Sequence, residues 1–136
     1  NKTILLMINF FSKYKFIFYL YNLILIFLYL FPGSFVGCHF YDNCKYDPQL
    51  TPDFIISSNH LYAFFILSYI GHLTFYKSSQ LLLINTYLIS LSLVLEILHI
   101  FIPERAFQFT DLIGNFAGVL IVIILFYFFK NEKFKN

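Results

Sequence analysis

The sequence predicts an all-α, polytopic membrane protein with four transmembrane helices, both of whose termini lie in the cytoplasm. Of its 136 residues, 60% are hydrophobic and only 12% are charged, and the mean hydropathy is +0.74. This composition is far more apolar than that of a soluble domain. Four apolar runs are separated by breaks rich in Pro, Gly, Ser or Lys. Because they leave no room for a separate soluble domain, we expect one transmembrane domain over residues 1–136.

The N-terminal part predicts a short apolar segment followed by the first transmembrane helix. Residues 3–12 are apolar, but a stretch of about ten residues is too short to cross a bilayer. Lys13 and Lys15 follow it, so it forms either a short interfacial helix or an extension of the next helix. Residues 16–31 carry no charge and end at a Pro-Gly-Ser breaker. Because the chain starts at Asn1 rather than Met, we expect it to lack its true start, with a cleaved signal peptide as the alternative.

Residues 33–58 form a long polar connection that contains both cysteines. Cys38 and Cys44 lie close enough in sequence to close a small disulfide loop if the segment faces an oxidising compartment. Free thiols are the alternative. His39 lies beside Cys38, but two cysteines and one histidine do not form a recognisable zinc motif.

The other apolar runs predict helices over residues 59–76, 81–102 and 111–129. Within the last of these, Gly114 and Gly118 form a pair of small residues one turn apart. Such pairs let transmembrane helices approach closely, so we expect the fourth helix to pack tightly against a neighbour.

The basic residues orient the four helices. If both termini are cytoplasmic, most of these residues lie on the cytoplasmic side: Lys2, Lys13, Lys15, Lys77, Lys130, Lys133 and Lys135. Only Lys45 and Arg105 then lie outside, which is the positive-inside pattern. We therefore expect a multi-pass protein of the cell inner (cytoplasmic) membrane, in contact with membrane lipids. The net charge of +2 and the dispersed lysines give no basis for nucleic-acid binding.

Polar residues gather at the outer ends of these helices. At about 1.5 Å per residue, Glu96 and His99 lie roughly 9 Å and roughly 5 Å from the outer end of the third helix, and Asn115 roughly 6 Å into the fourth. Glu96 and His99 are three residues apart and therefore lie on one face of the third helix. Asp111 and Asn115 are four residues apart and lie on one face of the fourth. Charged residues in apolar runs are costly and usually functional. The expected site comprises His60, Glu96, His99, Arg105, Asp111 and Asn115.

Three interpretations of this site stay open. In the first, Glu96 pairs with Arg105 and locks the third helix to the fourth, while Asp111 caps the fourth. In the second, Arg105 and Asn115 donate hydrogen bonds to an anionic or polar group, and Glu96 and His99 accept them. In the third, the histidines and carboxylates perform metal-assisted or acid–base chemistry.

The sequence favours neither a metal nor an enzyme. A Glu-x-x-His pair on a helix can chelate, but the set lacks a motif as specific as that of a zinc protease. We therefore expect no cofactor and no bound metal, and we leave the question of an enzyme open while leaning against it. If the site is hydrogen-bonded, His99→Gln should be tolerated, because Gln also supplies a donor and an acceptor.

The same residues carry a resemblance to a known family. The motifs are His60-Leu61-Tyr62-Ala63-Phe64, Glu96-x-x-His99, Pro103-x-Arg105-x-Phe107 and Asp111-x-x-x-Asn115-x-x-Gly118. Together they resemble the VanZ-like family of small bacterial integral membrane proteins, over residues 30–126. The family more often has Gln at position 99, and its usual Asp-Lys pair before the first His is replaced here by uncharged residues. The resemblance implies a role at the cell envelope, with teicoplanin (lipoglycopeptide) resistance as the activity linked to the family.

A function of another class competes with this one. The chain has little mass outside its apolar helices and contains 20 Phe residues. It is therefore also suited to be a non-catalytic accessory subunit, packed through its aromatic surface against a larger membrane protein complex.

Overall fold

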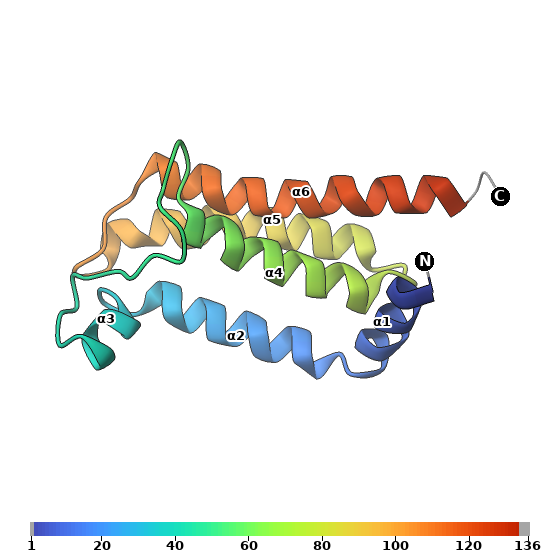
Figure 1. Ribbon diagram of the computed structural model, residues 1–136, viewed down its shortest axis with the longest axis horizontal. Coiled ribbons are helices and arrows are strands. Elements are labelled where there is room, and N and C mark those ends of the chain that lie inside the picture. The colour runs from blue at the N-terminus through green and yellow to red at the C-terminus, as the bar shows by residue number, and fades with distance from the viewer. Residues whose placement is uncertain (1, 134–136) are drawn as a thin grey trace.

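The computed structural model describes residues 2–133, with side chains up to residue 130, and this part of the chain contains helices and loops but no strand. The helices are α1 (Lys2–Lys13), α2 (Phe16–Leu30), α3 (Phe35–Phe40), α4 (Ser58–Phe75), α5 (Leu81–Leu98), a 3-10 turn (His99–Phe101) and α6 (Phe109–Lys133). Helices α2, α4, α5 and α6 run lengthwise through an elongated bundle (Figure 1). The prediction of an all-α fold is confirmed.

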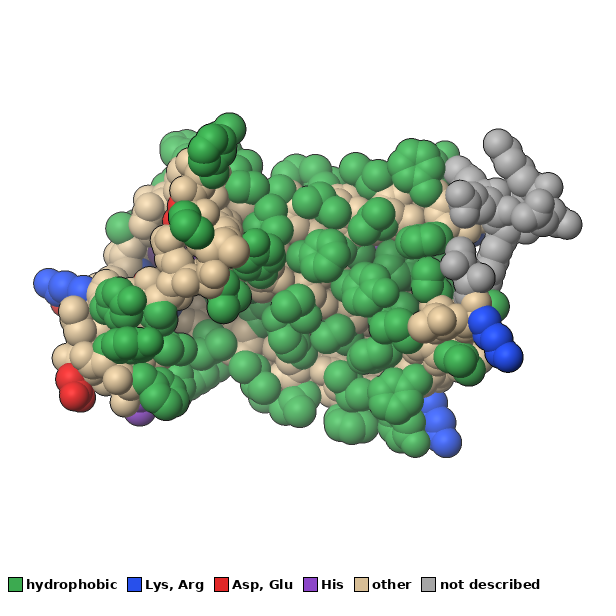
Figure 2. All heavy atoms as spheres, in the orientation of Figure 1, with side chains coloured by type: hydrophobic (Ala, Val, Ile, Leu, Met, Phe, Trp, Pro, Cys, Tyr) green, Lys and Arg blue, Asp and Glu red, His purple; other side chains and the backbone are tan. Residues whose placement is uncertain are grey.

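The two ends of the bundle differ. One end, the lysine end, holds α1, the C-terminal end of α6 and the turn between α4 and α5 (Figure 1). The other end, the loop end, holds α3 and the connections over residues 31–57 and 99–108. On the face shown in Figure 2, hydrophobic side chains cover the middle, whereas charged side chains lie at the ends. This is the surface that a membrane-embedded bundle requires.

Two or three helices are long and apolar enough to cross a membrane. The segment Leu81–Phe101 and the segment Phe109–Lys130 are long and apolar enough, and α1 with α2 makes a third only if this bent pair counts as one span. Helix α4 does not qualify, although the sequence predicts a span there. The reason is that its polar residues lower its hydropathy. It contacts α1, α2, α5 and α6. Because neighbouring helices cover it, it can carry Asn59, His60 and His72 without exposing them to lipid.

Helix α1 is not an extension of α2, because the two axes differ by 78°. It packs against the lysine end instead. Ile8 is buried in a cluster with Leu73, Val122 and Phe126, and the Ser12 hydroxyl faces the carbonyl of Thr74 at 3.2 Å. Of the two alternatives for this segment, the straight extension is therefore wrong.

The loop end is closed by a segment in which the sequence analysis predicts no helix. The short helix α3 begins after Ser34, whose hydroxyl accepts a hydrogen bond from the Gly37 amide at 3.0 Å. Cys38 and Cys44 form a disulfide, which is the first of the two alternatives for these residues. The Ser34 amide donates to the carbonyl of Cys44 at 2.8 Å. These contacts fold the connection back over the ends of the long helices.

Close contact between α4 and α6 positions the rest of the loop end. A methyl group at Gly118 would lie 2.6 Å from the carbonyl oxygen of Leu61, and one at Gly114 would lie 2.7 Å from that of Ser57. Both distances are too short for a real side chain. The two glycines therefore let the backbones touch, as small residues do in membrane helix pairs.

We expect Gly118→Ala to destabilise the protein by roughly 1–3 kcal/mol, because the added methyl meets rigid backbone and forces the two helices apart. This loss should outweigh the gain of about 1 kcal/mol in helix propensity. Gly71→Ala is the matched control, because its methyl would approach the Phe18 ring, at 3.1 Å, rather than backbone. Unfolding midpoints in detergent measure the difference, and equal midpoints for the two variants would contradict a backbone contact at Gly118.

Candidate functional site

Four helices and the 3-10 turn bring polar side chains together at the loop end. We call this set the polar cluster; it comprises Tyr29, His60, Glu96, His99, Asp111 and Asn115. Glu96 and Asn115 are fully buried, and His99 is 1% exposed. The sequence analysis predicts all of these residues except Tyr29. The helix bundle thus gathers them at one depth, as the helix geometry predicts.

Asn115 lies at the centre of the cluster. Its Nδ2 donates to the carbonyl of Ser92 at 3.4 Å, so its Oδ1 must face the other way. The Tyr29 hydroxyl donates to that Oδ1 at 2.6 Å, and Nδ1 of His60 lies 3.1 Å from it. The Tyr29 hydroxyl also lies 3.1 Å from Nδ1 of His60, but its proton is directed at Oδ1 of Asn115, which is closer. Because an amide oxygen only accepts hydrogen bonds, the contact between Nδ1 and Oδ1 then assigns the proton of His60 to Nδ1.

This assignment leaves the other nitrogen of His60 facing an acid. Nε2 of His60 lies 3.5 Å from Oδ2 of Asp111. A neutral His60 protonated at Nδ1 has a lone pair on Nε2, and an ionised carboxylate has lone pairs as well, so two acceptors face each other. The contact therefore requires a second proton or another cation between the two groups.

Glu96 shows a similar pattern with the second histidine, His99. Its Oε1 accepts a hydrogen bond from the Gln108 amide at 3.0 Å and lies 3.4 Å from Nδ1 of His99. Nε2 of His99 donates to the carbonyl of Tyr29 at 3.1 Å. Oε2 of Glu96 has no hydrogen-bond partner among the buried side-chain atoms that the structure describes. A buried carboxylate oxygen without a partner is costly.

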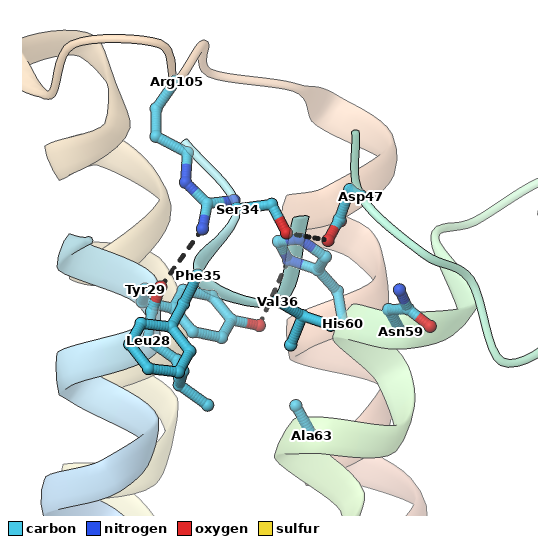
Figure 3. Close-up of a pocket in the computed structure, with 10 residues that line it drawn as sticks. All are labelled: Leu28, Tyr29, Ser34, Phe35, Val36, Asp47, Asn59, His60, Ala63 and Arg105. Carbon is cyan, nitrogen blue, oxygen red and sulfur yellow. Dashed lines mark hydrogen bonds between the residues drawn. The ribbon is translucent and has the colours of Figure 1, made fainter. Parts of the chain in front are cut away.

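Arg105 does not pair with Glu96, so the ion pair of the first interpretation is not formed. Its guanidinium donates from Nε to the carbonyl of Phe31 at 3.3 Å and from Nη2 to that of Leu28 at 3.1 Å. These carbonyls end α2, where a helix has free acceptors and partial negative charge. The physical reason for the difference is that the 103–108 corner folds over α2. The Glu96 carboxylate already has the Gln108 amide and His99 as partners. Figure 3 shows Arg105 reaching from its loop toward this helix end.

Two adjoining cavities open beside the cluster. One of about 170 Å³ lies between α2, α3 and α4 (Figure 3), and one of about 160 Å³ borders Asp111 and His99. Both are lined by Ser34, Asp47, His60 and Arg105. His60 thus joins the buried cluster to space at the loop end.

The charges around these cavities favour a cation over an anion. Glu104 and Lys45 lie at the mouth and pair with each other at 3.6 Å. Arg105 is directed at carbonyls, whereas Asp47 and Asp111 line the cavity and Glu96 lies behind it. The acids therefore outweigh the available bases. Of the earlier interpretations, a pocket for an anionic group fits this geometry least well.

Sequence reasoning missed three residues that build the site. Tyr29 is one of 11 tyrosines and looks like part of an aromatic belt, yet it is 8% exposed and bonds to the cluster. No local pattern separates it from the other tyrosines near the ends of the first helix. Ser34 and Asp47 bond to each other at 3.2 Å, and no periodic pattern marks loop residues of this kind.

Comparison with known protein families, curated proteins and solved structures found no match to this chain. The structure itself therefore defines its class. It is an all-helical protein with two or three helices that could cross a membrane and a buried cluster of histidines and carboxylates at one end.

Double-mutant cycles test the pairing within the cluster. We expect Glu96→Ala and His99→Ala to be strongly coupled, by roughly 0.5–3 kcal/mol, because each leaves the other's buried group without its partner. Glu96→Ala and Arg105→Ala should be close to additive, since Arg105 binds α2 instead. Free energies of unfolding in detergent give both coupling energies, and a larger coupling for Glu96 with Arg105 would contradict the geometry.

Proposed function

We propose that this chain is a VanZ-like protein of the bacterial cytoplasmic membrane, with four spans and both termini in the cytoplasm. Helices α2 and α4 run beside α5 and α6 (Figure 1), so they would cross the membrane together with them. Lys2, Lys13 and Lys130 belong to helices that meet the lysine end, and Lys77 bonds to Asn9 of α1 at 2.8 Å. In this orientation the positive-inside pattern places the lysine end in the cytoplasm.

The loop end then faces the outside of the cell. A disulfide between Cys38 and Cys44 suits that side, because the cytoplasm keeps thiols reduced. Helix α1 would lie along the cytoplasmic surface, since it is bent sharply away from α2. The polar cluster would open toward the cell envelope.

The observation that carries the function is the position of His60 between two acids at an outward cavity. Its Nδ1 lies 3.8 Å from Oε2 of Glu96, and its Nε2 lies 3.5 Å from Oδ2 of Asp111. We infer that this cavity binds a cationic or hydrogen-bond-donating group of an envelope ligand. Acceptors in a partly buried site act more strongly on such a group than they would in bulk water. Teicoplanin resistance, the activity linked to the resembling family, is the cellular readout.

Thiol labelling tests the orientation. In intact cells treated with a mild reductant, Cys38 and Cys44 should react with a membrane-impermeant thiol reagent. The matched control is a variant with both cysteines changed to Ser and with Ser78→Cys in the turn between α4 and α5. That thiol should react only after permeabilisation, and the reverse pattern would contradict the proposed topology.

Teicoplanin susceptibility tests the site. Expression of the chain in a teicoplanin-susceptible bacterium should raise the minimum inhibitory concentration. Asp111→Asn should remove this effect, because it deletes one of the charges that face the cavity, whereas Asp42→Asn in the outer loop should not. An unchanged susceptibility with the wild-type chain would contradict the link to resistance. Full resistance with Asp111→Asn at normal membrane levels would contradict the role of the cavity.

A further inference from the structure

We propose that His60, Glu96 and Asp111 bind a divalent transition-metal ion, for which Zn²⁺ is the best-fitting candidate. This inference rests on the proposed function, because it identifies the cation that the outward cavity holds.

The three side chains already lie close to one another. Each offers one ligand atom, and these atoms all lie within 4.8 Å of one another. Ligand atoms in a tetrahedral zinc site are about 3.4 Å apart, as follows from bonds of about 2.1 Å. Nε2 of His60 and Oδ2 of Asp111 have this spacing, at 3.5 Å. Oε2 of Glu96 lies 3.8 Å from Nδ1 of the same ring, so the Glu96 carboxylate would have to shift toward Nε2 to complete the set.

Two polar atoms of these side chains lack a hydrogen-bonding partner, which indicates that a cation is missing. Oε2 of Glu96 is buried and has no hydrogen-bond partner among the described residues. Nε2 of His60 presents a lone pair to Asp111, because Nδ1 donates to Asn115. Two carboxylates buried near each other carry unfavourable charge. One divalent ion would supply the missing partner for both atoms and neutralise both charges.

The surroundings hold the ligands as a metal site requires. A metal-binding histidine usually donates its other nitrogen to a fixed acceptor, which sets its tautomer, and Asn115 plays that part for His60 at 3.1 Å. The Gln108 amide holds the other oxygen of Glu96 at 3.0 Å. Three protein ligands leave one tetrahedral position open, and the cavity of about 160 Å³ adjoins it. Zinc sites that bind water or substrate have this form.

The ligand types distinguish between metals. Calcium prefers six or more oxygen ligands and magnesium an octahedron of oxygens, whereas an imidazole with two carboxylates suits a transition metal. His99 is not part of the triad, because its two nitrogens face Oε1 of Glu96 and the carbonyl of Tyr29. The metal-assisted interpretation of the sequence includes His99 among the candidate ligands, although the sequence favours no bound metal.

Zinc titration of the full-length chain in mild detergent tests the proposal. After metal is removed with a chelator, the wild type should bind one Zn²⁺ per chain, and Zn²⁺ should raise its unfolding midpoint, because the ion binds the folded state. Asp111→Asn and His60→Gln should each weaken binding more than roughly tenfold. His72→Gln is the matched control for His60→Gln. His72 is also buried, but its Nδ1 bonds to the carbonyl of Ser68 in its own helix at 2.9 Å, so Zn²⁺ binding should not change.

Two results would overturn this inference. One is a wild-type chain that binds no Zn²⁺ and shows no shift in unfolding midpoint, a result that does not depend on how any variant folds. The other is unchanged binding in Asp111→Asn, which would place the ion elsewhere. Absence of Zn²⁺ binding together with intact teicoplanin resistance would leave the proposed function standing. Loss of resistance or reversed thiol labelling with normal Zn²⁺ binding would contradict the proposed function alone.

Discussion

The amide of Asn115 is the constraint on which the loop end depends. Through it, α6 is joined to Tyr29 of α2, to His60 of α4 and to the carbonyl of Ser92 in α5. Each bond contributes only about 1 kcal/mol net, but a buried partner left without one costs about 1–3 kcal/mol. No apolar side chain at position 115 could satisfy the three partners. The same amide selects the tautomer of His60, and thereby decides which nitrogen faces Asp111 and the cavity.

This amide can reach its partners only because α6 lies unusually close to α4. Gly114 and Gly118 allow the backbones to touch at Ser57 and Leu61, which sets the height at which the first turns of the two helices meet. Packing and electrostatics are therefore linked. Charged groups occupy the loop end, where four helices and the 3-10 turn supply hydrogen bonds, whereas the middle of the bundle is filled by apolar side chains such as Phe64, Leu67 and Leu88. An arrangement of this kind confines polar chemistry to one side of a membrane.

Much of this arrangement follows from the sequence. The long helices are predictable because apolar runs end at Pro, Gly and Lys, and the depth of Glu96, His99 and Asn115 follows from helix rise alone. The rest depends on tertiary contacts that no local pattern records. The partner of Arg105 is a helix end far away in sequence, Tyr29 is indistinguishable from the other tyrosines, and α4 is less apolar than a span because other helices cover it. The bend between α1 and α2 likewise reflects packing of Ile8 rather than a breaker.

Nitrogen NMR of isotope-labelled histidines tests the central claim most directly, because it reports which ring nitrogen of each histidine carries a proton. The resonances of His60 can be assigned by their loss in His60→Gln, with His39 and His72 as reference side chains away from the cluster. The hydrogen bond from His60 to Asn115 predicts a proton held on Nδ1 of His60, and predicts that Asn115→Ala releases it. A His60 ring with its proton on Nε2 and a bare Nδ1 would contradict the arrangement around Asn115.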